Sequence, residues 1–250
     1  MEEILNILHK FDPITLEEMK GVKLLNRVDT KYSFNIKYLP GILQVLAPEY
    51  RILAFGDIRA NHYETLYFDT PDFMLYNQHQ CGKLNRYKFR YRCYQDTQII
   101  FFEVKFKNNK KRTIKKRIRM SSVDAEIKGL ASDFVVKNSP VDPSKLLPRL
   151  WVRYTRITLV NKNSQERLTI DLNLSYQDGN LTRSSSFPHL VIAELKQDKS
   201  TDSFFAAYMR TIRIHRVSIS KYCFGIYNMY DHVRYNNFKE KFRKIIKIAS

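Results

Sequence analysis

The chain has 250 residues, 44% of them hydrophobic and 13% aromatic, enough to bury a core in one large β-rich domain or two small ones. Its 43 lysines and arginines outnumber 25 aspartates and glutamates, which gives a formal charge of +18. This excess predicts a polyanionic partner, either nucleic acid, an anionic membrane or a phosphate-rich small molecule. Charge alone does not choose among them.

The three cysteines form no C-x-x-C motif, so the sequence indicates neither a disulfide framework nor a thiolate zinc site. The N-terminal segment is acidic and lacks the basic stretch followed by an apolar run that a signal peptide has. No segment reaches the roughly 18 apolar residues of a membrane span. We therefore expect a cytoplasmic protein. The sequence also lacks a P-loop and a G-x-G-x-x-G turn, which argues against those two modes of nucleotide binding.

Few glycines and no low-complexity linker divide the chain, so residues 1–250 are expected to form a single domain. Helices are predicted near the N-terminus and over residues 39–46, with a strand between them. Alternation of β-branched and aromatic residues predicts further strands over 59–69, 83–94, 99–107, 112–120, 150–161, 166–176 and 190–195. Helix and loop are expected over 122–147, a helix over 202–212 and a last strand over 217–224.

Basic residues are concentrated between positions 81 and 120, where fourteen lysines and arginines accompany only Asp96 and Glu103. The charged residues follow the two-residue period of a β-strand, so that each strand has a charged face and an apolar face. The charged faces contain Arg27, Asp29 and Lys31; Lys88, Arg90 and Arg92; Glu103, Lys105 and Lys107; Lys115, Arg117 and Arg119; Arg167, Thr169, Asp171 and Asn173; and Glu194 and Lys196.

Two interpretations of this alternation remain open. In the first, a two-layer sheet exposes a solvated outer face. In the second, a closed antiparallel barrel turns its charged faces inward around an anion, and helices cover the apolar faces. Repeated arginines favour the second, because the planar guanidinium grips phosphate oxygens with two hydrogen bonds.

Carboxylates inside a basic barrel would compete with phosphate for the cations. A bound metal would explain their presence: Glu194, supported by Glu103 or Asp171, would hold Mg²⁺ or Mn²⁺ together with the phosphates. The alternative for each carboxylate is an internal salt bridge to a neighbouring arginine.

The chain resembles the VTC domain of vacuolar transporter chaperone polyphosphate polymerases, in the triphosphate tunnel metalloenzyme (CYTH-like) superfamily. The resemblance covers roughly residues 26–227. It rests on the order and spacing of NRVDTKYSF (26–34), YETLYFDTPDFMLY (63–76), KFRYRCY (88–94), FFEVKFK (101–107), RYTRITL (153–159), ERLTIDLNL (166–174), VIAELK (191–196) and SKY (220–222). One departure is Ser218, where the family often has a lysine; His215 or Arg216 would have to compensate.

The resemblance implies an α+β, β-rich fold, a closed antiparallel β-tunnel with peripheral helices. It also implies transfer of the γ-phosphate of ATP to inorganic polyphosphate, with Mn²⁺ or Mg²⁺ as cofactor. The expected catalytic residues are Arg90, Arg92, Lys105, Arg156 and Lys221. The expected substrate-binding residues are Arg27, Lys31, Lys88, Arg117, Tyr154, Arg167, Lys196 and Ser220, and the expected metal ligand is Glu194, with Glu103 and Asp171 as weaker candidates.

Two other functions remain open, and a third is not expected. Water in place of the acceptor would make the same site a triphosphatase or polyphosphatase. A non-catalytic polyphosphate or inositol-phosphate sensor would keep the arginines but would not need Glu194. Nucleic-acid binding is not expected, because stacking needs aromatics beside the charges, and most aromatics of the basic strands alternate onto the opposite face.

The C-terminal segment, residues 236–249, is predicted to form a basic amphipathic helix, with Phe238, Phe242, Ile245 and Ile246 on one face. Two interpretations are open for it. The helix either caps the core or flanks the tunnel, or it contacts a membrane surface or a membrane-protein partner.

Overall fold

The computed structural model describes residues 1–20, 27–110, 112–198 and 202–249. In these residues eleven strands form one sheet, whose main path runs β2-β11-β9-β8-β4-β5-β6-β7. All neighbours on this path are antiparallel. The strands are β1 (Asp12–Ile14), β2 (Arg27–Asn35), β3 (Tyr50–Leu53), β4 (Asn61–Asp69), β5 (Arg86–Tyr94), β6 (Ile99–Lys107), β7 (Thr113–Met120), β8 (Leu147–Asn161), β9 (Glu166–Asp178), β10 (Ser184–Phe187) and β11 (Leu190–Asp198).

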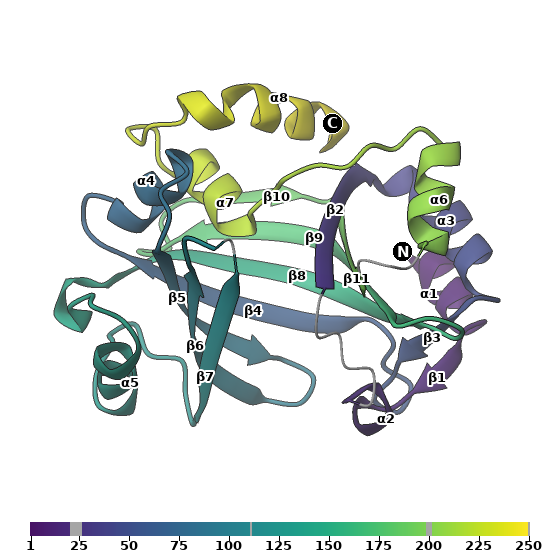
Figure 1. Cartoon of the computed structure of the whole chain (residues 1–250), viewed down its shortest axis with the longest axis horizontal. Helices are drawn as coiled ribbons and strands as arrows, with labels where there is room; N and C mark the ends of the chain where they lie inside the picture. Colours follow the sequence, from purple (N-terminus) through teal and green to yellow (C-terminus); the bar gives the residue numbers. More distant parts are fainter. Residues whose placement is uncertain (21–26, 111, 199–201, 250) are drawn as a thin grey trace.

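Helices surround the sheet, as Figure 1 shows. They are α1 (Glu2–Leu8), α2 (Leu16–Lys20), α3 (Leu39–Leu46), α4 (Met74–Gln80), α5 (Leu130–Asn138), α6 (Phe204–Thr211), α7 (Lys221–Met229) and α8 (Lys239–Ala249), with short 3₁₀ turns at Ile36–Tyr38, Pro143–Lys145 and Asn236–Phe238. The predicted β-rich α+β fold is confirmed. The predicted strands lie within a few residues of the observed ones, except the last.

The apolar faces of the strands form the core under two groups of helices. Leu168 and Ile170 of β9 pack with α1, α3 and α6, while Phe89 of β5 and Phe102 of β6 pack with α5. Burial of these side chains is what the alternating pattern predicts, because successive residues of a strand point to opposite faces. The charged face is therefore the other face of the sheet.

The strand predicted over residues 217–224 is wrong, because this segment enters helix α7. The Ser220 hydroxyl accepts a hydrogen bond from the backbone N–H of Cys223 and so caps the helix N-terminus. Tyr222, Phe224 and Ile226 are all buried, which a half-buried strand would also show. A short apolar run of this kind does not distinguish the two structures.

Helix α4, absent from the sequence prediction, is held by a buried carboxylate. Asp69 at the end of β4 accepts hydrogen bonds from the N–H groups of Leu75 and Tyr76 and from the hydroxyl of Tyr222. It therefore joins the start of α4 to α7.

Helix α8 caps the core, as one of its two interpretations predicted. Phe242 and Ile245 are buried in the same cluster as Phe224 of α7. The contact with a membrane surface through this apolar face is not supported, because the face is covered by the protein itself. Among the described residues, no helix is long and apolar enough to cross a bilayer.

Backbone pairing does not close the sheet in the described residues, since the ladder ends at β2 and at β7. The sheet nevertheless curls toward its charged face. Four strands separate β2 from β5 in the ladder, yet Lys31 of β2 donates to the carbonyl of Ile219 at 3.0 Å and Lys88 of β5 donates to the hydroxyl of Ser220 at 2.9 Å. The segment before α7 thus spans the gap between these strands.

Candidate functional site

Strand register brings the charged residues of seven strands onto one surface. Directly opposed residues of an antiparallel pair share a face, and the opposed pairs include Lys31 and Glu194, Lys196 and Arg167, Arg156 and Asp171, Arg90 and Glu103, Lys88 and Lys105, and Lys105 and Lys115. We call this surface the basic face. It comprises Lys31, Lys88, Arg90, Arg92, Lys105, Lys115, Arg156, Arg167 and Lys196, with Glu103, Asp171 and Glu194, and Lys221 of α7 reaches it.

Exposure of the side chains decides between the two interpretations of the alternation. The side chains of Glu103 and Asp171 are only 1% and 2% exposed, and those of Arg90 and Arg156 are 16% and 15% exposed. A solvated outer face would leave such groups in water. The charged face is therefore turned inward at these residues, whereas Lys105 of β6 and Lys115 of β7 are exposed.

Asp171 is the counterion of two cations. Arg156 donates to it from Nε at 2.6 Å and from Nη2 at 2.8 Å, and Lys221 contacts the same carboxylate. Burial alone would raise the pKa of Asp171, but Arg156 and Lys221 outweigh it and hold that pKa at about 2. This carboxylate is ionised and fixes both cations on the basic face.

Glu103 performs the same task on the neighbouring strands. Arg90 donates to it at 2.6 Å, and Lys115 contacts its other oxygen. Burial opposes ionisation of Glu103, whereas Arg90 and its neighbours lower its pKa well below the usual range. The interpretation of Glu103 and Asp171 as metal ligands is thus not supported, since each is engaged by two cations. The described residues contain no group of three or more metal-binding side chains.

Glu194 differs from these two carboxylates. It is 22% exposed, and one oxygen lies 2.7 Å from Nζ of Lys196. Burial alone would raise the pKa of Glu194, but the nearby Lys31 and Lys196 lower it by more, so the carboxylate is ionised. A single carboxylate is enough where the other ligands of Mg²⁺ are phosphate oxygens and water. Glu194 therefore fits a metal that arrives with the substrate.

Lys88 and Lys105 are two neighbouring cations of the basic face. They lie directly opposite each other, and no described carboxylate forms an ion pair with either. Partial loss of hydration and repulsion from Lys88 and Arg90 lower the pKa of Lys105 to about 7. Like charges opposed across strands destabilise a sheet, so this arrangement favours a bound anion.

A row of aromatic side chains also lies on the basic face, and the sequence analysis missed most of it. Tyr154 stacks on Tyr63 with ring centroids 5.2 Å apart, and the Arg156 guanidinium lies 5.0 Å from the Tyr63 ring. Arg92 lies 5.8 Å from the same ring, and Arg90 donates to the Tyr67 hydroxyl at 2.7 Å. Stacking and hydrogen bonding hold the guanidinium groups in place. Of this row, the sequence prediction contained only Tyr154.

Ser220 and Lys221 reach the basic face from a helix N-terminus instead of from the predicted strand. Ser220 accepts from Lys88, and Lys221 lies over the Tyr154 ring at 4.8 Å. Arg216 pairs through its backbone with Tyr32 of β2. His215, Arg216 and Ser218 are exposed, and none of their described contacts shows a replacement for the family lysine.

The remaining predicted residues occupy the margin of this surface. Arg117 is exposed, with its guanidinium 4.3 Å from the ring of Phe101. Arg167 faces Lys196 across the β9–β11 pair. The side chain of Arg27, at the start of β2, lies outside the described residues.

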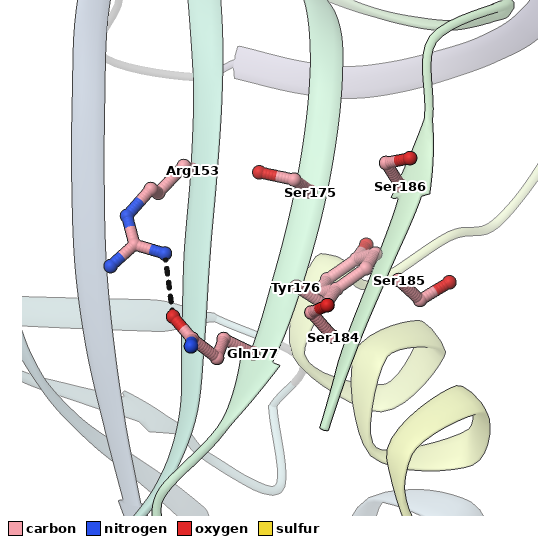
Figure 2. Close-up of a pocket in the computed structure, with 7 residues that line it drawn as sticks. All are labelled: Arg153, Ser175, Tyr176, Gln177, Ser184, Ser185 and Ser186. Atoms are coloured by element: carbon pink, nitrogen blue, oxygen red, sulfur yellow. Dashed lines mark hydrogen bonds between the residues drawn. The ribbon is translucent and has the colours of Figure 1, made fainter. Parts of the chain in front are cut away.

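A second surface, on the opposite face of β8 and β9, is less suited to a polyanion. Figure 2 shows this pocket of about 330 Å³, in which Arg153 points to Gln177. Arg153 also donates to Glu64. Its charge is already balanced by that carboxylate, and serine side chains from β9 and β10 line the rest of the pocket.

Binding of a polyanion to the basic face is expected to weaken as the pH rises from 6.5 to 8.5. Lys105, with a pKa of about 7, and Lys115, with a pKa lowered to about 8 by burial, both lose their protons in this range. Fluorescence titrations across this range measure the effect. In Lys105→Arg the side chain stays charged, so the affinity should fall less steeply with pH than in the wild type. Titration of the ligand itself affects both proteins equally and cancels in the comparison. Equal slopes would contradict this role of Lys105.

Comparison with known proteins places this geometry in a family. The family model of the VTC domain matches residues 26–230 of the sequence. No curated protein matches the chain. Among solved structures, a candidate adenylyl cyclase from Hippeastrum, described as having a dominant triphosphatase activity, has a TM-score of 0.53 and 14% identity, covering 81% of this chain and 96% of that one.

A candidate adenylate cyclase from Bacillus halodurans has a TM-score of 0.50 and 14% identity, covering 78% of this chain and 94% of that one. At this identity the likeness concerns the fold alone. The family match spans most of the chain and includes the strands that form the basic face. The chain therefore belongs to the VTC-domain family and has the triphosphate tunnel fold.

Proposed function

We propose that the chain is an ATP-dependent polyphosphate polymerase, which transfers the γ-phosphoryl group of ATP to a growing polyphosphate on the basic face. The observation that carries this proposal is the excess of cations on the basic face, above all Lys88 and Lys105. These two lysines lie opposite each other, and no described carboxylate forms an ion pair with either of them. A chain of phosphates supplies the missing negative charge at regular spacing. Membership of the VTC-domain family supports the same substrate class.

Phosphoryl transfer asks a protein mainly to align donor and acceptor and to neutralise charge on the transferred group. Arg90, Arg92 and Arg156 present guanidinium forks held by aromatic rings and carboxylates, and in this proposal they bind the phosphate oxygens. Lys88, Lys105 and Lys221 add point charges. In the reaction, an oxygen of the terminal phosphate of the polyphosphate chain bonds to the γ-phosphorus of ATP. The bond between this phosphorus and the β,γ-bridging oxygen breaks, and ADP leaves.

The acceptor oxygen is already ionised at neutral pH, so the reaction needs no general base. Glu194 would hold Mg²⁺ or Mn²⁺, which supplies further charge neutralisation on the phosphates when it is bound. We also propose that the protein acts in the cytoplasm. Cys93 and Cys223 are buried and unpaired, and all three cysteines are free thiols, as in reducing compartments.

The test is incubation of the purified chain with ATP and Mn²⁺ or Mg²⁺, with and without a short polyphosphate primer, followed by gel separation. We expect a metal-dependent ladder of polyphosphate. The double variant Arg90→Ala/Arg92→Ala should reduce the yield by at least about 100-fold, because two charge-assisted contacts of about 1.5–3 kcal/mol each are lost. Glu194→Ala should also reduce the yield, because it removes the proposed metal ligand.

Lys116→Ala is the matched control, because Lys116 is an exposed lysine on the alternate face of β7. It should leave the ladder unchanged. Release of free phosphate without a ladder would replace the proposal with a triphosphatase that uses water as acceptor. Tight polyphosphate binding without turnover would indicate a non-catalytic sensor.

A further inference from the structure

Two half-buried aromatic rings and one arginine lie at the end of the basic face that is remote from α7. Tyr94 ends β5 and Phe101 lies on β6, with ring centroids 6.1 Å apart. The Arg117 guanidinium lies 4.3 Å from the Phe101 ring, within stacking distance. We call Tyr94, Phe101 and Arg117 the aromatic shelf.

The aromatic shelf belongs to the basic face by register. Phe101 is directly opposite Arg92, and Tyr94 is directly opposite Tyr63, whose ring contacts both Arg92 and Arg156. The neighbouring Phe102, on the other side of β6, is fully buried under α5. Phe101 and Tyr94, although Tyr94 packs against the cluster that contains Tyr63, remain partly accessible.

The cations form a path that ends at the aromatic shelf. Lys88, at the other end, contacts Ser220 and lies over the ring of Tyr222, and beyond them α7 and α8 fill the space with an apolar cluster. Tyr94 lies six positions after Lys88, about 20 Å along an extended strand. A ligand whose phosphates lie along Lys88, Arg90 and Arg92 therefore has room for an uncharged group beside the aromatic shelf.

We propose that the aromatic shelf binds the nucleobase of the donor nucleotide. This inference rests on the proposed function, because it assigns the base of ATP to a place beside the phosphate-binding cations. Bases stack on aromatic rings and on guanidinium planes, and such stacking depends little on base identity because every base has a π-face. We therefore expect ATP and GTP to bind with similar affinity.

Comparison of ATP with inorganic tripolyphosphate tests the aromatic shelf, since the two ligands share the phosphates but only ATP has a base. Calorimetric titrations of the full chain use a buffer of fixed ionic strength that contains EDTA, so that neither ligand turns over. Phe101→Ala should lower the affinity for ATP by about 5- to 100-fold, the range of one lost stacking contact. Its affinity for tripolyphosphate should change by less than about twofold.

Two further variants separate stacking from folding. Phe101→Trp keeps an aromatic plane and should restore ATP binding. Phe106→Ala removes an aromatic side chain from the opposite face of the same strand, where it stacks on Tyr87, and should alter neither affinity.

An equal loss of both ligands in Phe101→Ala would overturn the inference, as would equal affinities for ATP and tripolyphosphate in the wild type. Either result would leave the proposed polymerase intact, since tripolyphosphate binding would remain. Failure of the wild type to bind either ligand would overturn the proposed function and, with it, the assignment of the base.

Discussion

Replacing Lys88 and Lys105 together with methionine should stabilise the ligand-free protein and weaken polyphosphate binding by about 10²- to 10⁴-fold. Each lysine provides a charge-assisted contact of about 1.5–3 kcal/mol to a phosphate, and about 1.4 kcal/mol corresponds to a tenfold change in affinity. Without ligand, however, the two ammonium groups repel each other across the β5–β6 pair. Stability and binding should therefore change in opposite directions, as is common at functional sites.

The gain in stability should depend on pH. The pKa of Lys105 is lowered to about 7 in the folded protein, whereas an unfolded lysine titrates near 10.4. Between these values the unfolded chain binds more protons, so wild-type stability rises with pH and the destabilising charge is fully present only below about pH 7. Thermal melts should thus show the largest difference between variant and wild type at pH 6 and almost none at pH 10.

Lys116→Met, on the exposed alternate face of β7, removes one charge outside the basic face and is the matched control. It should change neither the melting temperature nor the affinity by much. A less stable double variant would show that the lysines stabilise the ligand-free fold, for instance through the bond from Lys88 to Ser220. Unchanged affinity would place the polyphosphate elsewhere.

The sequence was sufficient to predict which residues share a face but not which of them meet. Arg156 and Asp171 were separate candidates, and their pairing depends on the register of β8 against β9. That register follows from a sheet in which β11 and β9 lie between β2 and β8, an order that local alternation does not contain. The same limit applies to the carboxylates, whose two interpretations only the structure could distinguish.

The aromatic row and α7 show two other limits. Most aromatics of β5 alternate away from the charges, as predicted, but Tyr63 of β4 and Tyr154 of β8 share the basic face with Arg92 and Arg156. Which face of the sheet Tyr63 and Tyr154 occupy depends on how β4 and β8 pair with the neighbouring strands, and the sequence does not contain this pairing. In α7, the apolar residues after Ser220 suit a strand or a helix equally, and the cap at Ser220 decides for the helix.

Asp171→Ala should be the most destabilising of these changes, and bound polyphosphate should offset it. The carboxylate is 2% exposed and holds both Arg156 and Lys221, so its loss leaves two cations with reduced hydration and no counterion. Removing one partner of a buried ion pair costs about 3–5 kcal/mol, which corresponds to a fall of about 10 °C in melting temperature for a domain of this size. Thermal melts with and without polyphosphate measure both effects.

The ligand should raise the melting temperature of Asp171→Ala more than that of the wild type, because its phosphates replace the missing negative charge. Glu64→Ala is the control, since Glu64 pairs with the exposed Arg153 on the opposite face, and such pairs contribute at most about 1 kcal/mol. If polyphosphate stabilised the two variants equally, Arg156 and Lys221 would not be among the groups that bind it. The cations held by Asp171 would then serve the fold alone, and the phosphates would be bound by the other cations of the basic face.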